Sequence, residues 1–183
     1  MTIYEKADEL IYKSGLLSLL NKYGDTFIVG SYRTKMMTWN DLDFYIDNRN
    51  FILPKYYNLV GNVLNKMKPS HFDGLFNIEK NLLFFGFETN IYGERWNIDI
   101  WLKSREEIEE SLLSEDKLMR LVEEKPEYKK VILEIKQELT RLKLYGFDKK
   151  QSHYHSNEIY DAVLYNNVLS IEQFFSFYTS EKN

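Results

Sequence analysis

The spacing of apolar residues changes several times along this chain, and each change indicates a different element. Between residues 3 and 22 the apolar positions recur every three or four residues, which predicts an amphipathic helix ended by Gly24. A second helix is expected over 52–68, with Pro54 in its first turn. Short runs rich in β-branched and aromatic residues predict four strands, at 25–30, 41–47, 82–93 and 95–102.

After residue 103, charged helical patterns replace the strands. Ser104 and Glu107 have the spacing of a capping box, which predicts the start of a long charged helix. We expect this helix to be interrupted near Pro126 and to end at about residue 145, before Gly146. Two shorter helices follow, and their predicted N-caps are Ser156 and Ser170.

The order of these elements predicts an α/β (α+β) fold. Strands and helices alternate through residues 1–103, which favours a mixed β-sheet with helices packed on it. Residues 104–183 contain only helical patterns. We therefore expect a sheet-containing core over 1–103 and a C-terminal helical region over 104–183.

The composition limits the class of protein. There are no cysteines, so disulfides, a cysteine nucleophile and thiolate metal sites are excluded. The first residues do not resemble a signal peptide and no apolar run is long enough to cross a bilayer, so we expect a cytoplasmic protein without a membrane partner. The net charge of −4 and the scattered basic residues argue against long nucleic acid as a partner.

Two acids stand out in the strand predicted over 41–47. Asp41 and Asp43 are one residue apart, so on a strand both side chains point to the same face, while Leu42 and Phe44 point to the other. Two neighbouring carboxylates repel each other unless a cation lies between them. Mg²⁺ prefers oxygen ligands and keeps waters that substrate phosphates can replace. The pair therefore predicts a magnesium site.

A group suited to phosphates precedes these acids. Gly30 allows a ligand to approach the backbone closely, and the hydroxyl of Ser31 adds a hydrogen-bond donor. Arg33 and Lys35 bring positive charge to the same segment, which is predicted to turn into a short helix. We expect these four residues to contact the phosphates of a nucleotide.

A third acid would hold the cation from another side. Asp99 stands alone among apolar residues in the strand predicted over 95–102, where an acid is costly unless it is paired or bound to a metal. If this strand pairs beside 41–47, its carboxylate converges with the other two. Glu88, which also stands among apolar residues, is the alternative third acid.

These residues resemble the signature of the DNA polymerase β-like nucleotidyltransferase superfamily. In that signature an apolar residue and Gly-Ser are followed, after a short interval, by Asp-x-Asp, and a third acid comes on a later strand. The resemblance covers about residues 24–103, and its matching segments are Val29-Gly30-Ser31, Asp41-Leu42-Asp43 and Ile98-Asp99-Ile100.

The resemblance implies an enzyme. It implies that Asp41 and Asp43 bind Mg²⁺ at the phosphates of an NTP, and that Asp99 assists the metal and orients or deprotonates an acceptor hydroxyl. The hydroxyl would attack the α-phosphorus, and pyrophosphate would leave. Gly30 and Ser31 would hold the outer phosphates. We expect ATP as the nucleotide, AMP as the transferred group and a small molecule as the acceptor.

Alternatives stay open at this level. A chain with this fold could bind a nucleotide without turnover and act with a partner protein. Another kind of phosphotransfer through the same metal clamp is a weaker alternative. Many small members of the superfamily act as dimers, so a homodimer also stays open, and one sequence does not identify the base or the acceptor.

Overall fold

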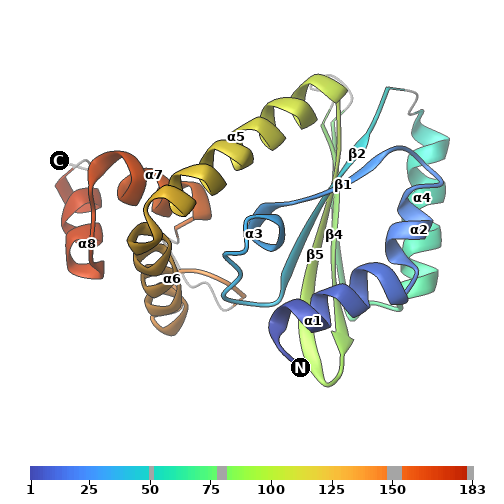
Figure 1. Cartoon of the computed structure of the whole chain (residues 1–183). Coiled ribbons are helices and arrows are strands. Elements are labelled where there is room, and N and C mark those ends of the chain that lie inside the picture. Colours follow the sequence, from blue (N-terminus) through green and yellow to red (C-terminus); the bar gives the residue numbers. More distant parts are fainter. Residues whose placement is uncertain (50–51, 78–81, 148–153, 181–183) are drawn as a thin grey trace. The chain divides into compact units, whose positions relative to one another are not determined.

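The computed structural model of the protein describes residues 1–49, 52–77, 82–147 and 154–180 (Figure 1). The chain divides into two compact units, Met1–Glu115 and Asp116–Asn183. The first unit contains a β-sheet and its covering helices, and the second is helical. Within the described ranges, no helix is both long and apolar enough to cross a lipid bilayer.

The first unit is built on a five-stranded sheet with the strand order β1-β2-β5-β4-β3. β2 and β5 are parallel, and the other neighbouring strands are antiparallel, so the sheet is mixed. The mixed α/β fold class predicted from the sequence is confirmed. The strands are β1 (Thr26–Val29), β2 (Asp41–Asp47), β3 (His71–Asn77), β4 (Leu82–Ile91) and β5 (Glu94–Lys103).

The sequence-based prediction missed β3. Its residues, HFDGLFN, include a glycine and an acid and are nearly all exposed, so no alternating apolar pattern marks a buried face. The strand pairs with β4 over its whole length, from His71 opposite Glu88 to Asn77 opposite Leu82. It is therefore an edge strand that tertiary pairing stabilises more than local propensity does.

The continuous helix predicted over 3–22 is wrong. The segment consists of α1 (Ile3–Asp8), a short π-helix η1 (Glu9–Lys13) and α2 (Leu16–Leu20). Gly15 separates the last two elements with φ of +78°, a left-handed conformation that an α-helix does not contain. The apolar spacing continues across this break, so the pattern alone does not reveal it.

One face of the sheet carries the hydrophobic core. The helices α1, α2 and α4 (Leu53–Met67) cover this face, and the short helix α3 (Gly30–Arg33) lies on the other side (Figure 1). Alternate residues of β2 and β5 form the centre of the core, and each is at most 2% exposed: Leu42, Phe44, Ile46, Ile98, Ile100 and Leu102. Because side chains alternate along a strand, the residues between them point to the opposite face.

The remaining helices are α5 (Arg105–Glu124), which begins in the first unit, and α6 (Pro126–Arg141), α7 (Ser156–Asn166) and α8 (Ile171–Ser180) in the second. The capping box before α5 is confirmed. The Ser104 hydroxyl accepts from the Glu107 N–H at 3.2 Å, and the Glu107 carboxylate accepts from the Ser104 N–H at 2.8 Å. Ser170 also caps its helix, because its hydroxyl accepts from the Gln173 N–H at 3.3 Å.

The end of α6 differs from the prediction. The helix ends at Arg141 rather than near residue 145. Lys143 adopts a left-handed conformation with φ of +58°, so the chain leaves the helix before it reaches Gly146.

The start of α7 also differs by one residue. The N-cap is His155 rather than Ser156. The Glu158 carboxylate accepts a hydrogen bond from the His155 N–H at 2.6 Å, which fixes the cap at that position.

Candidate active site

The three predicted acids lie on the sheet face opposite the hydrophobic core. Asp41 and Asp43 belong to β2 and Asp99 to β5, and all three residues are partly buried. The parallel register places Asp43 directly beside Asp99, and Asp41 beside Asn97, so the expected pairing of these strands is confirmed. Adjacent strands are about 4.8 Å apart, so the Asp43 and Asp99 carboxylates arise from neighbouring backbone positions.

Two glycines make room for two of these carboxylates. A Cβ atom on Gly30 would clash with Oδ2 of Asp43, and Gly30 has φ of +71°, which other residues rarely adopt. A Cβ atom on Gly86, the β4 residue opposite Asp99, would lie 2.7 Å from Oδ1 of Asp99. Gly86 was not predicted as a site residue, although a glycine inside an apolar strand is a sign of close approach.

The side chains do not form a complete metal-binding cluster as they stand. Among the residues that the structure describes, no three His, Cys, Asp or Glu side chains are arranged to hold an ion. Asp41 accepts a hydrogen bond from Nδ2 of Asn97 at 2.8 Å. The site still fits a hard divalent cation in its chemistry, because its donors are carboxylate oxygens from two adjacent strands.

Gly30 and Arg33 meet at a carboxylate. The Gly30 N–H donates to Oε1 of Glu115 at 2.6 Å, and Nη1 of Arg33 lies 3.2 Å from Oε2 of the same side chain. Glu115 belongs to α5, and it was not predicted as a site residue because it stands in a charged run typical of a solvated helix. Gly30 and Arg33, which were both predicted to contact phosphate, therefore both contact the Glu115 carboxylate in this structure.

The other two residues predicted to contact phosphate are placed differently. Ser31 is buried, with 8% of its surface exposed. Lys35 is exposed, and its ammonium lies 4.5 Å from the centre of the Tyr32 ring and 4.9 Å from that of the Tyr4 ring. These distances are those of cation–π contacts, so the structure holds Lys35 on two aromatic rings.

Glu88, the alternative third acid, lies farther from the Asp-x-Asp pair. It belongs to β4 and its register partner is Asn97 of β5, so a whole strand separates it from β2. Its carboxylate forms an ion pair with Arg95 at 3.8 Å. The register therefore favours Asp99, on the strand next to Asp43, over Glu88.

An aromatic shelf, consisting of Tyr45, Phe84 and Trp101, continues the face that carries the acids. Trp101 is the register partner of Tyr45 on β2 and of Phe84 on β4, and the Phe84 and Trp101 rings are 4.4 Å apart. The Lys103 ammonium lies 5.4 Å from the Tyr45 ring and 5.8 Å from the Trp101 ring. Trp101 follows Asp99 by two residues, so strand alternation places both on one face.

The surroundings of Tyr45 raise the pKa of its phenol above the ordinary value. Burial raises the pKa of Tyr45, a hydrogen bond with Ser111 partly opposes this effect, and the negative charge of Asp43 raises the pKa further. At neutral pH this side chain can therefore donate a hydrogen bond but cannot act as a base.

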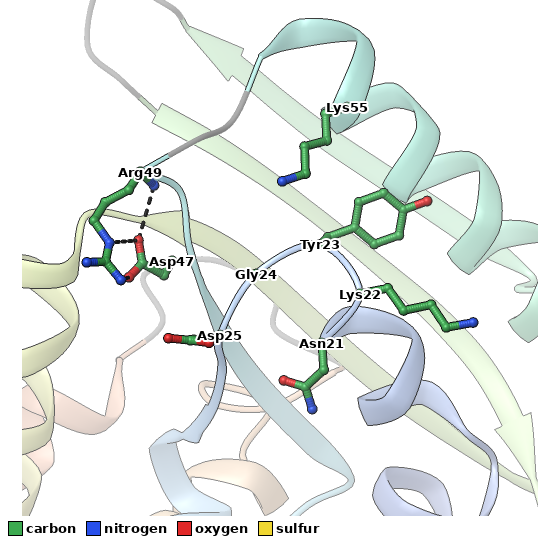
Figure 2. Close-up of a pocket in the computed structure, with 8 residues that line it drawn as sticks. All are labelled: Asn21, Lys22, Tyr23, Gly24, Asp25, Asp47, Arg49 and Lys55. Carbon is green, nitrogen blue, oxygen red and sulfur yellow. Dashed lines mark hydrogen bonds and ion pairs between the residues drawn. The ribbon is translucent and has the colours of Figure 1, made fainter.

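A polar pocket of about 310 Å³ lies at the opposite end of β1 and β2 from the acids (Figure 2). Asp47, the last residue of β2, is buried there, and its carboxylate lies 2.7 Å from Nη2 of Arg49. Most of the length of β2 separates this pocket from Asp41, so we do not assign it to the candidate active site. Its lining residues are Asn21, Lys22, Tyr23, Gly24, Asp25, Asp47, Arg49 and Lys55.

No family model and no curated protein matches this chain. Its fold resembles solved structures. The non-canonical poly(A) polymerase complex GLD-2–GLD-3 gives a TM-score of 0.65 at 9% identity, covering 88% of this chain and 51% of that one. The polymerase core of TRAMP, an RNA surveillance complex, gives 0.60 at 16% identity over 86% and 49% of the two chains. The Cid1 poly(U) polymerase with Mg and 3′-dATP bound gives 0.54 at 14% identity over 75% and 42%.

These similarities define the class of fold. The chain shares its fold with these poly(A) and poly(U) polymerases, so the fold that the resemblance implied is confirmed. The chain spans about half the length of those structures. The activities named for them therefore belong to considerably longer chains.

Proposed function

We propose that this chain transfers a nucleoside monophosphate from an NTP to an acceptor hydroxyl, with release of pyrophosphate. The observation that carries the proposal is the register of Asp43 beside Asp99, with Gly30 packed against Asp43, on a fold shared with solved nucleotidyltransferases. Carboxylates from two adjacent strands that face a Gly-Ser turn are suited to a metal-bound triphosphate.

The acids have distinct roles in this proposal. Asp41 and Asp43 hold Mg²⁺ from β2, and Asp99 joins them from β5. When bound, the ion stabilises negative charge on the phosphate oxygens. Asp99 also orients the acceptor hydroxyl or accepts its proton as that oxygen bonds to the α-phosphorus and the bond to pyrophosphate breaks. Most of the remaining catalysis is positioning of the two reactants.

The phosphate contacts come from the segment that precedes β2. The Gly30 N–H, the Ser31 hydroxyl and the Arg33 guanidinium bind the outer phosphates in this proposal. Lys35 would reach a phosphate only after it leaves the rings of Tyr4 and Tyr32.

We propose ATP as the nucleotide and AMP as the transferred group. One similar solved structure, GLD-2–GLD-3, is named as a poly(A) polymerase, which supports an adenine nucleotide. The Cid1 poly(U) polymerase is named for UTP selectivity, and another similar structure is named as an RNA terminal U-transferase. UTP is therefore titrated beside ATP as the competing nucleotide.

We propose a small molecule as the acceptor. The net charge of −4 is unfavourable for a long polyanion, since nucleic-acid affinity depends mainly on lysine and arginine contacts to phosphates. The aromatic shelf begins beside Asp99 and offers ring surfaces, tilted by 38° between Phe84 and Trp101, against which a ring of such an acceptor can pack.

An RNA end is the second candidate acceptor. The observation that favours it is that the similar solved structures are named as poly(A) and poly(U) polymerases and as part of an RNA surveillance complex. A short RNA with a free 3′-hydroxyl and a panel of small hydroxylated molecules would therefore be compared as acceptors in one transfer assay.

The proposal is tested first by calorimetric titration of a non-hydrolysable ATP analogue, with and without Mg²⁺. We expect binding to require Mg²⁺ and to weaken about a hundredfold in Asp43→Ala, because a carboxylate that holds the ion is lost. Asp73→Ala removes an exposed acid from the edge strand β3 and is the matched control. It should bind like the wild type.

Unchanged binding in Asp43→Ala would remove the site assignment. Absence of binding to any NTP by a folded protein would favour the non-catalytic alternative, in which the chain acts with a partner protein. Binding without transfer to any acceptor would favour a nucleotide-binding module over an enzyme.

A further inference from the structure

Glu115 has the hydrogen-bonding partners of a bound anion. Its Oε1 accepts from the backbone N–H of Gly30 at 2.6 Å, and its Oε2 lies 3.2 Å from Nη1 of Arg33. Backbone N–H groups and arginine guanidinium groups are also the donors that commonly bind phosphate oxygens. The proposed function assigns these same two donors to the nucleotide.

The contact is partly shielded from water. The Glu115 side chain is 14% exposed and the Arg33 side chain is 26% exposed. Exposed ion pairs contribute little, but partial burial strengthens both the electrostatic attraction and the charge-assisted hydrogen bonds. The Glu115 carboxylate is therefore able to compete with a ligand for these donors.

Glu115 and a phosphate cannot occupy the position together. Gly30 has a single N–H, and Glu115 already accepts its hydrogen bond. Oδ2 of Asp43 packs against the α-carbon of the same glycine, so a phosphate placed there would add negative charge beside two acids. A cation at Asp43 would offset one of these charges, but the Glu115 carboxylate would still block the donor.

We infer that Glu115 is an internal competitor for the phosphate position, and that nucleotide binding exchanges its carboxylate for a phosphate on Gly30 and Arg33. The identity of the nucleotide rests on the proposed function, whereas the exchange of anions rests on the contacts of Glu115. Because these contacts must break first, the apparent affinity for the nucleotide is lowered by the fraction of molecules in which the position is open. Without a ligand, the same carboxylate holds Arg33 in place.

The exchange is tested by calorimetric titration of inorganic tripolyphosphate into wild type and Glu115→Gln in excess Mg²⁺. Glutamine keeps an oxygen for the Gly30 N–H but loses the charge that attracts Arg33. We expect the variant to bind tripolyphosphate about tenfold more tightly, because one shielded charge-assisted contact no longer competes. Glu110→Gln removes the same charge from an exposed position of α5, and this matched control should bind like the wild type.

Three results would overturn the inference: equal or weaker binding by Glu115→Gln, equal tightening by the Glu110→Gln control, or no binding by either the wild type or Glu115→Gln. A second readout uses the wild type alone and does not depend on how a variant folds. In NMR spectra, tripolyphosphate should shift the Gly30 amide and the Glu115 side-chain carboxyl resonances together. A shift of the Gly30 amide without a shift at Glu115 would also contradict the exchange.

The two proposals fail separately. If tripolyphosphate behaves as expected but no acceptor receives a nucleotide, the proposed function fails and the exchange of anions stands. If nucleotide transfer is measured but Glu115→Gln binds tripolyphosphate no more tightly than the wild type, the exchange fails and the proposed function stands.

Discussion

The carboxylates of Asp43 and Asp99 each lie against a glycine, so the candidate site depends on two residues without side-chain chemistry of their own. Position 30 requires glycine both because its φ is positive and because a Cβ atom would clash with Asp43. Position 86 requires glycine only because a Cβ atom would clash with its neighbours. Gly30 was predicted because the Gly-Ser motif marks it. Gly86 was missed because a lone glycine in an apolar strand also suits a bulge or a bend.

Replacing Gly30 with alanine should damage both the fold and the site. We expect Gly30→Ala to lower the free energy of unfolding by about 1–2 kcal/mol, because alanine is strained at this φ and its methyl group displaces Asp43. Urea unfolding and Mg²⁺-dependent nucleotide binding measure the two effects. Gly61→Ala in α4 is the control, since its new Cβ meets nothing within 4 Å.

The control should change stability in the opposite direction. Alanine favours a helix over glycine, so Gly61→Ala should raise the free energy of unfolding by up to about 1 kcal/mol. A Gly30→Ala protein that matches the wild type in stability and binding would show that Gly30 tolerates a side chain, and the packing of Asp43 would need another account.

Asp47 makes the stability of the first unit dependent on pH. Burial alone would raise the pKa of Asp47, but its hydrogen bonds with Arg49 and the charge of Arg105 hold that pKa below its ordinary value of 3.8. The unfolded chain therefore binds this proton at a higher pH than the folded chain does. The stabilisation is complete above pH 3.8 and is lost as the pH falls through the lower, folded pKa.

Asp47→Asn should remove this acid-sensitive contribution. We expect the variant to be about 1 kcal/mol less stable than the wild type at neutral pH, a modest value because Arg49 is 60% exposed. The difference, measured by urea unfolding, should shrink as the pH falls below 3.8 through the lower pKa of the folded state. Asp25→Asn, at a 70% exposed side chain, should show a much smaller change. A difference that is constant with pH would contradict this origin.

At the scale of elements, the parallel pairing of β2 with β5 brings acids from distant parts of the sequence together. Alternating apolar residues predicted both strands and the face on which the acids lie. The pattern could not predict β3, which is exposed and forms by pairing with β4, or the break at Gly15, which the apolar spacing crosses. Local chemistry predicted the caps at Ser104 and Ser170 but placed the cap of α7 one residue late.

The cap of α5 should be worth a measurable part of the stability. We expect Ser104→Ala to lower the free energy of unfolding by about 1 kcal/mol, because the Glu107 N–H loses its side-chain acceptor. Ser114→Ala changes an exposed serine inside the same helix and should be neutral or slightly stabilising. Thermal and urea unfolding of both variants would measure this difference, and equal effects would rule out a capping role.

At the scale of the whole molecule, the first unit contains the sheet, the acids and Glu115, and the second unit contains α6, α7 and α8. The class of fold was predictable because Gly30-Ser31 follows one predicted strand, and the Asp41-x-Asp43 pair and Asp99 lie in two later predicted strands. The contact of Glu115 was not predictable, because α5 follows the motif by many residues and its charged pattern gives no sign of a buried partner.

The acceptor class should be visible in the salt dependence of transfer. We expect the rate to change little between low and moderate salt if the acceptor is a small neutral molecule. An RNA acceptor held by six or more phosphate contacts would lose roughly a thousandfold in affinity over the same range. Initial rates at limiting acceptor measure the effect. A steep loss with salt would contradict a small-molecule acceptor and favour an RNA end.

The packing of Gly30 against Asp43, and of Gly86 against Asp99, has an evolutionary consequence. In each pair the glycine is constrained by the carboxylate, so selection on one position acts on the other. Descendants that lose the acid at position 99 remove one of the two close contacts at Gly86, and the other is the Phe84 ring, whose Cζ would lie 2.9 Å from a Cβ atom there. Lineages that have kept the acid at position 99 should therefore keep glycine at 86, and a side chain at 86 should occur only in chains where positions 84 and 99 have both changed.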